Sequence, residues 1–147
     1  MAIGCDHGGL DLKEAVISVL NDLNLSYEDM GTYDRQSCDY PDFAEKVAGS
    51  IASGACQQGI LICGTGIGMS MAANKIPGIR AALCNEIFSA KMARAHNDAN
   101  ILCLGARVVG SGVAQEIVRA YFTGGFEGGR HAGRVGKIGL LEQKRQG

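Results

Sequence analysis

The sequence predicts an α/β fold: a three-layer α/β/α sandwich around about five parallel strands. Short apolar runs alternate along the chain with stretches of helical periodicity. Several of these runs are continuously apolar rather than alternating, which indicates strands buried on both faces by helices. The length of 147 residues suits one domain with a full core. We therefore expect residues 1–147 to form a single domain of Rossmann-like type.

The first part of the chain predicts two β-α units. Residues 1–5, "MAIGC", form a short apolar strand, and "GGLDLKEAVISVLNDL" follows as a helix. A second strand is expected near residues 25–30. A helix over about 42–53 begins at Pro41, where a missing N–H costs little. The apolar face of the first helix carries Leu12, Val16, Val19, Leu20 and Leu23.

Three further strands, each followed by a helix, and one last helix complete the predicted fold. The strands are "GILIC" (59–63), "IRAALC" (79–84) and "ANILCLG" (99–105), each followed by a helical pattern. The segment "GSGVAQEIVRAYFTGG" predicts a helix with Ser111 as its N-cap and Gly124 as its end.

The last helix, about 129–145, contains glycines that each cost about 1 kcal/mol relative to alanine. Its own propensity is therefore poor. We expect it to pack on a partner subunit. The glycines are Gly133, Gly136 and Gly139.

Composition excludes several classes of protein. Hydrophobic residues make up 46% and charged residues 20%, as in ordinary globular proteins. No apolar run approaches the roughly 18 residues that span a bilayer, and the N-terminus lacks the pattern of a signal peptide. No compact basic stretch with interleaved aromatic residues suggests nucleic-acid binding. We expect a cytoplasmic protein with neither membrane nor nucleic-acid partners.

The six cysteines show no C-x-x-C spacing and lie scattered in apolar segments. We interpret them as free thiols in a reducing compartment, and five of them as small buried hydrophobes.

Charge is distributed unevenly, with a net −7 over residues 1–50 and +6 over residues 51–147. A site for an anion should therefore draw on the later part of the chain.

Ligands of open parallel sheets bind beyond the carboxyl ends of the strands. "DHGG" (6–9) follows the first strand, "CGTGIG" (63–68) follows the third, and Arg107 follows the fifth. We also expect "AHNDAN" (95–100), just before the fifth strand, at this edge. His7 and His96 would then both belong to the functional edge.

The glycine loop does not fit a nucleotide site. Met69 stands where a dinucleotide fingerprint has its third glycine, and no Lys followed by Ser or Thr completes a P-loop. The loop instead offers a row of backbone N–H groups, which suit any anion, including an enediolate formed during a reaction.

Cys63 comes directly before this row, where a thiol's pKa can fall below about 8.5. The thiolate could then be a nucleophile paired with His96, or a base that removes a proton beside a carbonyl.

Two arginines in the last helix indicate the chemical class of the ligand. Arg130 and Arg134 are four residues apart and share one helical face. Together with Arg107 they can converge on one phosphate. A small phosphorylated substrate is favoured over a merely solvated basic face.

The motifs "GCDHGG", "DYPDFA", "GILICGTGIGMSMAANKIPGIRAALC", "AHNDANILCLGARVVG" and "FEGGRHAGRV" together resemble the ribose-5-phosphate isomerase B family. This family belongs to a wider group with allose-6-phosphate and galactose-6-phosphate isomerases. The resemblance runs in order from residue 1 to about 145. It implies interconversion of D-ribose 5-phosphate and D-ribulose 5-phosphate through a cis-enediolate, without metal or organic cofactor.

The resemblance also implies roles for single residues. Cys63 matches the base that moves a proton between C1 and C2, and His96 matches the group that donates a proton in ring opening. One branch of the family has a glutamate base where this chain has Met69, so the thiolate mechanism is expected here. Asp6 lies beside the sugar, Asn97 contacts a hydroxyl, Gly64, Thr65, Gly66, Ile67 and Gly68 form the anion loop, and His7, Arg107, Arg130 and Arg134 bind phosphate.

Family members are dimers, often tetramers, whose sites combine two chains, so we expect a homodimer or a dimer of dimers. Two alternatives remain open from the sequence. One keeps the chemistry and changes the substrate to a six-carbon phosphosugar such as allose 6-phosphate or galactose 6-phosphate. The other is a noncatalytic phosphosugar-binding subunit.

Overall fold

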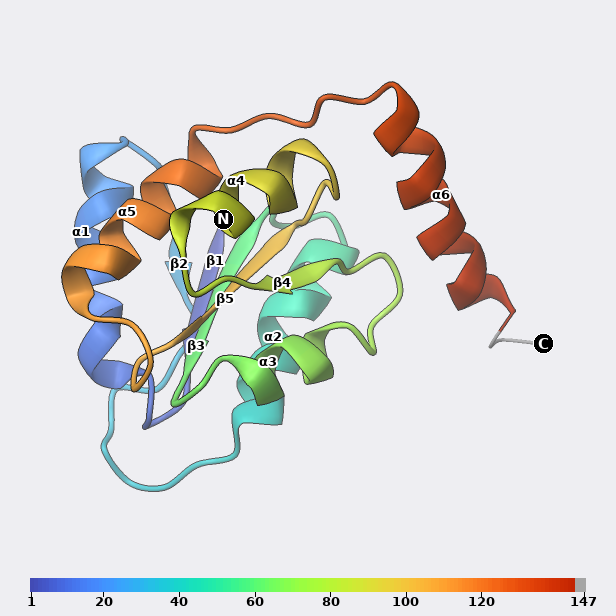
Figure 1. The fold of residues 1–147 in the computed structure, drawn as a ribbon. Coiled ribbons are helices and arrows are strands. Elements are labelled where there is room, and N and C mark those ends of the chain that lie inside the picture. The colour runs from blue at the N-terminus through green and yellow to red at the C-terminus, as the bar shows by residue number, and fades with distance from the viewer. Residues whose placement is uncertain (145–147) are drawn as a thin grey trace.

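A computed structural model describes residues 1–144. In it, five parallel strands form one sheet in the order β2-β1-β3-β5-β4 (Figure 1). The predicted parallel α/β fold is confirmed. The strands are β1 (Ala2–Cys5), β2 (Glu28–Asp29), β3 (Gly59–Cys63), β4 (Ala81–Leu83) and β5 (Ile101–Gly105).

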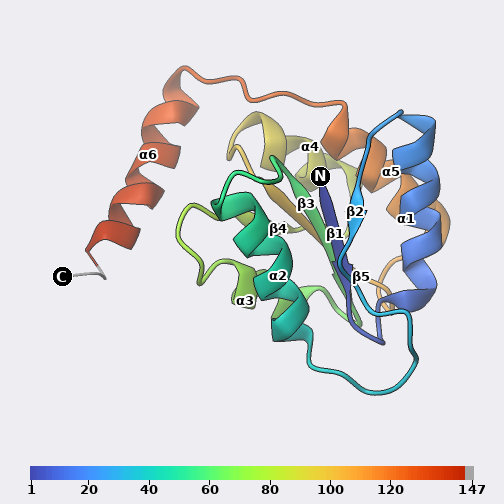
Figure 2. The same ribbon diagram turned by 180° about the vertical axis from the view of Figure 1, so that it is seen from behind.

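Helices cover both faces of the sheet and make the three layers (Figures 1 and 2). One face packs against α1 (Leu10–Asp22), α4 (Ile87–Ala95) and α5 (Ser111–Phe122). The other face packs against α2 (Tyr40–Ala52) and α3 (Ile67–Ala73). Gly110 is the N-cap of α5 and Ser111 is its first residue, so the predicted cap was one residue late.

The central strands divide their side chains between two cores, as the two-residue period of a strand requires. In β3, Ile60 and Ile62 face the core under α1 and α5, whereas Leu61 and Cys63 face the core under α2 and α3. Every residue of β3 and β5 is buried. Burial on both faces explains their continuous apolar runs.

Strand β4 is shorter and more exposed than the predicted strand 79–84. Its residues are half-buried, because β4 is an edge strand that pairs only with β5. The Asn74 side chain binds the free edge: Ala81 N–H donates to Oδ1 and Nδ2 donates to the Ala81 carbonyl, both at 2.9 Å. These bonds satisfy the Ala81 main chain and block pairing with another strand.

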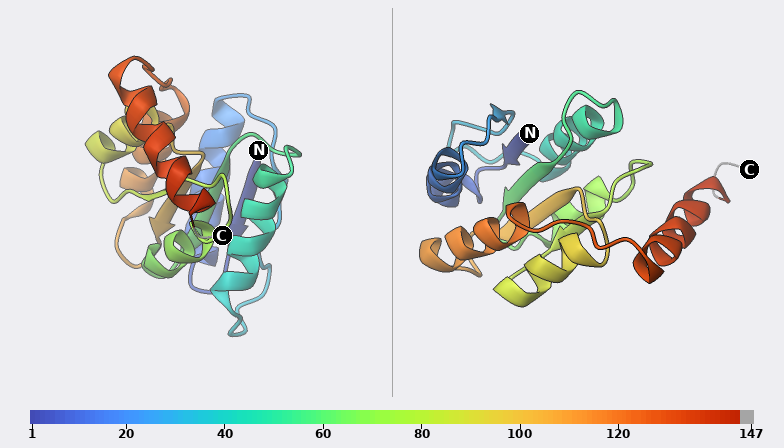
Figure 3. Two further views of the ribbon diagram at one scale, coloured as in Figure 1. Left: turned by 90° about the vertical axis from the view of Figure 1, so that its right-hand side faces the viewer. Right: turned by 90° about the horizontal axis from the view of Figure 1, so that it is seen from above.

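Helix α6 (Arg130–Gln143) stands away from the sheet and its covering helices (Figure 3). Residue 145, the expected end of this helix, lies outside the described residues. A Cβ added at Gly133, Gly136 or Gly139 would meet no atom within 4 Å. Near the helix ends, His131 is buried and Glu142 Oε2 accepts the Gly78 N–H at 3.0 Å. Among residues 1–144, no helix combines the length and apolar character needed to cross a membrane.

A buried ion pair fixes the segment that leads from β2 toward the carboxyl edge of the sheet. Lys13 Nζ lies 2.9 Å from Asp29 Oδ2, with side-chain exposures of 6% and 11%, and donates to the Thr32 carbonyl at 2.8 Å. The ammonium also lies 4.0 Å from the centre of the Tyr33 ring. Sequence periodicity did not single out Lys13, because its position on α1 falls beside the apolar stripe.

Replacing Lys13 by methionine should lower the free energy of unfolding by about 3–5 kcal/mol, since Asp29 is left buried without its partner. Urea unfolding at fixed protein concentration measures the loss. The matched control is Arg35→Met, which breaks the exposed Arg35–Asp11 pair and should cost much less. Equal losses in the two variants would contradict this account of Lys13.

Candidate active site

Nine of the thirteen predicted site residues lie where the central strands end. Asp6, Cys63 and Arg107 follow or end the neighbouring strands β1, β3 and β5. Main-chain bonds lock these ends together: Asp6 N–H donates to the Ile62 carbonyl, and Arg107 N–H donates to the Gly64 carbonyl at 2.9 Å. His7 follows Asp6. These residues form what we call the carboxyl-edge set: Asp6, His7, residues 63–68 and Arg107.

The sulfur of Cys63 receives a main-chain hydrogen bond. Gly66 N–H donates to Sγ at 3.1 Å, and Cys63 is 5% exposed. This contact fixes the position of the sulfur at the start of the glycine loop.

Two glycines give the loop its shape. Gly66 has φ of +76°, and a Cβ there would lie 2.5 Å from Leu83 Cδ1. A Cβ on Gly105 would lie 2.5 Å from the Thr65 carbonyl oxygen. Any larger residue at either position would push the loop off β5. The close approach keeps the loop N–H groups next to Cys63 and is the reason for glycine at these positions.

Arg107 lies directly against this loop, since a Cβ on Gly64 would be 3.3 Å from its Nη1 atom. The guanidinium therefore adds positive charge beside the row of N–H groups. The Thr65 hydroxyl accepts the Ile67 N–H at 3.3 Å, and Thr65 is exposed. The loop is thus open to a small anionic ligand.

The structure orients Asp6 and His7 through main-chain donors. Asp6 is buried, and its Oδ1 accepts the Gly9 N–H at 3.0 Å. His7 Nδ1 accepts the Cys38 N–H at 3.2 Å. A neutral His7 must then carry its proton on Nε2, which becomes a donor for a ligand oxygen.

Tyr40 contacts the carboxyl-edge set, which sequence reasoning did not predict. A Cβ on Gly68 would lie 2.6 Å from Tyr40 Cζ, so the ring packs on the anion loop. Tyr40 is also partly exposed, at 40%. The motif "DYPDFA" contains it, but a tyrosine before a helix-opening proline gives no specific signal of a role in a site.

His96, Asn97, Arg130 and Arg134 lie elsewhere, and the expected placement of His96 at the carboxyl edge was wrong. In a parallel sheet, a residue that shortly precedes a strand lies at the amino edge, and His96 ends α4 just before β5. The Glu127 N–H donates to the Ala95 carbonyl at 3.0 Å and brings the start of α6 to the same place. We call His96, Asn97, Arg130 and Arg134 the amino-edge set.

The cysteines are all free, as expected. Burial raises the pKa of Cys5 and of Cys84 to about 11 and raises that of Cys103 as well, so these thiols stay protonated at neutral pH. Cys38 and Cys56 are only half-buried, which differs from the expected full burial.

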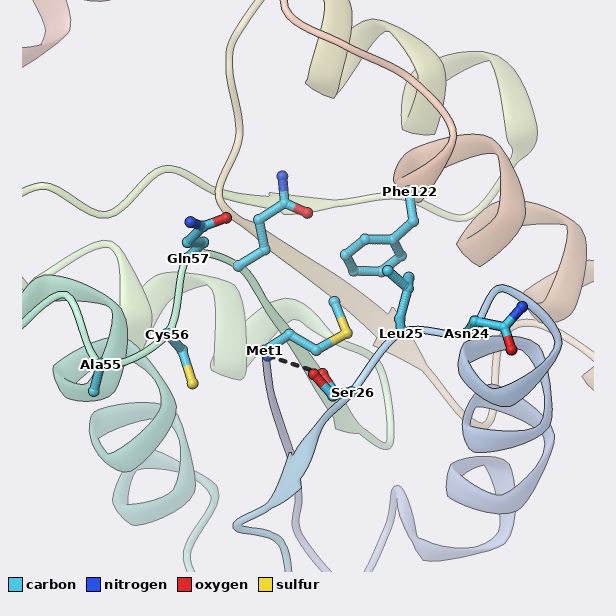
Figure 4. A pocket seen from close by; sticks show the side chains of 9 residues that line it. Met1, Asn24, Leu25, Ser26, Ala55, Cys56, Gln57 and Phe122 are labelled. Carbon is cyan, nitrogen blue, oxygen red and sulfur yellow. Dashed lines mark hydrogen bonds between the residues drawn. The ribbon is translucent and has the colours of Figure 1, made fainter.

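A cavity of about 470 Å³ opens near the N-terminus, lined by Met1, Leu25, Cys56 and Phe122 among others (Figure 4). The Met1 amino group donates to the Ser26 carbonyl within it. None of the predicted site residues lines this cavity. It is therefore separate from the carboxyl-edge set.

Comparisons with known proteins match this chain to sugar and sugar-phosphate isomerases. The family model "Ribose/Galactose Isomerase" matches residues 1–138. Ribose-5-phosphate isomerase B of Escherichia coli is 47% identical over 145 residues, which cover 99% of this chain and 97% of that protein. D-erythrulose-4-phosphate isomerase of Pectobacterium atrosepticum is 44% identical, covering 98% of this chain and 95% of that protein.

A solved structure agrees with these relatives. Ribose-5-phosphate isomerase B of Clostridium thermocellum superposes with a TM-score of 0.95 at 53% identity, covering 98% of this chain and 97% of that one. These matches cover nearly the whole chain and agree with the parallel sheet and with the cysteine that precedes the glycine loop. The chain therefore belongs to the ribose/galactose isomerase family, within its group of ribose-5-phosphate isomerases B.

Proposed function

We propose that this protein interconverts D-ribose 5-phosphate and D-ribulose 5-phosphate through a cis-enediolate, with Cys63 as the base. The observation that carries the proposal is the Gly66 N–H aimed at the Cys63 sulfur, beside a loop of further N–H groups and Arg107. The names of the Escherichia coli and Clostridium thermocellum relatives support this reaction.

The proton balance of the reaction assigns the roles. The Cys63 thiolate removes the proton from C2 of the open-chain aldose, and the electron pair moves through the C1–C2 bond onto O1. N–H groups of the 64–68 loop stabilise that oxyanion, apart from those of Gly66 and Ile67, which donate to Cys63 Sγ and the Thr65 hydroxyl. Cys63 then returns its proton to C1, while the O2 proton passes to O1, a transfer for which the exposed Thr65 hydroxyl is suited. Asp6 holds the sugar beside the sulfur.

We assign the phosphate to His7 and Arg107 of one chain and Arg130 and Arg134 of another. Because the amino-edge set is remote from Cys63 in its own chain, each site would combine the carboxyl-edge set of one protomer with the amino-edge set of its partner in a homodimer, or in a dimer of dimers. His96 would then donate a proton to the ring oxygen, and Asn97 would bind a hydroxyl. Exposed apolar side chains offer surface for this contact: Met71, Phe88, Ile138, Leu140 and Leu141.

The chain length of the substrate is the main alternative. The chemistry at C1 and C2 is the same for a six-carbon phosphosugar such as allose 6-phosphate or galactose 6-phosphate, and the Pectobacterium relative is named for a four-carbon one. Comparing kcat/KM of the purified protein on the three lengths separates these substrates. A noncatalytic phosphosugar-binding subunit is disfavoured, because the base, the anion loop and the basic groups are all present in the chain.

Replacing Cys63 by alanine should lower the turnover of ribose 5-phosphate by roughly 100- to 10,000-fold, the usual contribution of a general base. Phosphosugar binding, measured by titration calorimetry, should stay close to that of the parent protein. Cys56→Ala, at a half-buried cysteine that lines the separate cavity, is the matched control. Near-normal turnover of Cys63→Ala would refute the base assignment.

Arg134→Ala should chiefly raise KM for ribose 5-phosphate, because a phosphate contact binds the substrate and the transition state about equally. Steady-state kinetics on the purified variant measures the effect. Lys137→Ala removes another exposed cation from the same helix and should change KM little. An unchanged KM in Arg134→Ala would count against this residue as a phosphate ligand.

A shared site predicts complementation between impaired variants, assayed at a ribose 5-phosphate concentration far below the raised KM of the arginine variant. When Cys63→Ala is unfolded and refolded together with the double variant Arg130→Ala/Arg134→Ala, half of the dimers are mixed and each mixed dimer holds one intact site. Activity should return to about a quarter of the wild-type value. Cys63→Ala mixed with Asp6→Asn, both in the carboxyl-edge set, should recover none. Absence of recovery in the first mixture would show that sites are not shared.

A further inference from the structure

Three side chains meet where α6 joins the rest of the chain: His96, the proposed ring-opening acid, and Glu127 and His131, which have no role in the reaction as proposed above. Glu127 Oε2 lies 3.7 Å from His96 Nε2 and 3.6 Å from His131 Nε2. The two imidazole rings stack with centroids 4.1 Å apart and planes 7° from parallel. The Glu127 N–H donates a hydrogen bond to the Ala95 carbonyl, which fixes the main chain of Glu127 beside the end of α4.

The geometry favours a proton site over a metal site. Two histidines and a glutamate are ligands that Zn²⁺ accepts, and their ligand atoms lie within 4.8 Å of one another. Each imidazole, however, must point its nitrogen lone pair, which lies in the ring plane, at the ion. Two stacked parallel rings cannot both do so toward one ion. A carboxylate can interact with a proton on either ring, because an ion pair tolerates a wide range of angles.

Electrostatics disfavours a charged His131. His131 is buried on α6, and burial together with the nearby His96 lowers its pKa, with Arg130 and Arg134 acting in the same direction and Glu127 opposing them. Two charged rings at stacking distance would repel each other. The titratable and charged groups that act on His131 are therefore His96 at the end of α4, Glu127 in the segment before α6, and Arg130 and Arg134 on α6.

We propose that Glu127 is a positioning residue, whose carboxylate keeps one proton on the stacked His96–His131 pair and holds the His96 ring in place for ring opening. This inference rests on the proposed function, since it concerns a step that only a cyclic sugar needs. In that step the C1–O4 bond of the furanose breaks, O4 receives the proton from the imidazolium, and O1 gives its own proton to water and becomes the aldehyde oxygen.

The two sugars distinguish ring opening from proton transfer at carbon. Ribose 5-phosphate closes into a furanose through O4. Ribulose 5-phosphate cannot form a five-membered ring, because the hydroxyl it would need, at C5, carries the phosphate. Exchange of the C1 hydrogens of ribulose 5-phosphate with D₂O therefore requires Cys63 and the anion loop but no ring opening.

The test compares both reactions in Glu127→Gln, which keeps the size and the main-chain bond and removes the charge. Isomerisation of ribose 5-phosphate should fall about tenfold, within the range of general acid catalysis, while C1 exchange stays within about twofold. The alkaline limb of the pH profile for ribose 5-phosphate should move to lower pH, because the histidine pair loses its proton more easily without the carboxylate. Glu127→Asp should restore part of the rate.

Glu116→Gln, an exposed glutamate on α5, is the matched control and should change neither reaction. Equal losses of isomerisation and exchange in Glu127→Gln, or an unchanged rate and pH profile, would overturn the proposal. Failure of the proposed function would look different: the parent protein would show neither C1 exchange nor isomerisation, or Cys63→Ala would retain both.

Discussion

The polarity of the parallel sheet is the constraint on which the rest of this protein depends. All strands end at one edge, so the segments after β1, β3 and β5 converge there and bring Cys63 next to Asp6 and Arg107. The same polarity sends the ends of the connecting helices to the opposite edge, where His96 and the start of α6 lie. One chain therefore holds the carboxyl-edge set and the amino-edge set at opposite edges of the sheet, and in the proposed reaction a second chain brings them together.

Sequence reasoning located the central strands and Cys63 because their signals are local. Continuous apolar runs identify strands buried on both faces, and a cysteine that ends such a run must lie at the functional edge. The start of β4 could not be predicted in this way. Its first residue, Ala81, bonds to the side chain of Asn74, which takes the place of a neighbouring strand. Lys13 was missed for a related reason, since its burial depends on Asp29 across the fold.

The placement of His96 shows what motif reasoning leaves out. A motif gives the residues that act together, and the fold decides which chain supplies each of them. "AHNDAN" precedes its strand and "CGTGIG" follows its own, so sheet polarity alone separates them, even though both belong to one proposed site. Tyr40 is the reverse case: the structure packs it on Gly68, and no sequence pattern marks that contact.

Helix α6 connects assembly with chemistry. Its glycines weaken it as an isolated helix, and within one chain a Cβ at Gly133, Gly136 or Gly139 would meet no atom within 4 Å. Glycines expose the helix backbone, however, and allow a facing surface to approach closely, so a partner chain could provide the missing packing. The helix carries Arg130 and Arg134 on one face and is joined to the fold through His131, stacked on His96. On the proposed assembly, the contact that orders α6 would also deliver phosphate ligands and the ring-opening acid to the neighbouring Cys63. A dissociated chain would retain the base and the anion loop but lose the groups that hold and open the sugar.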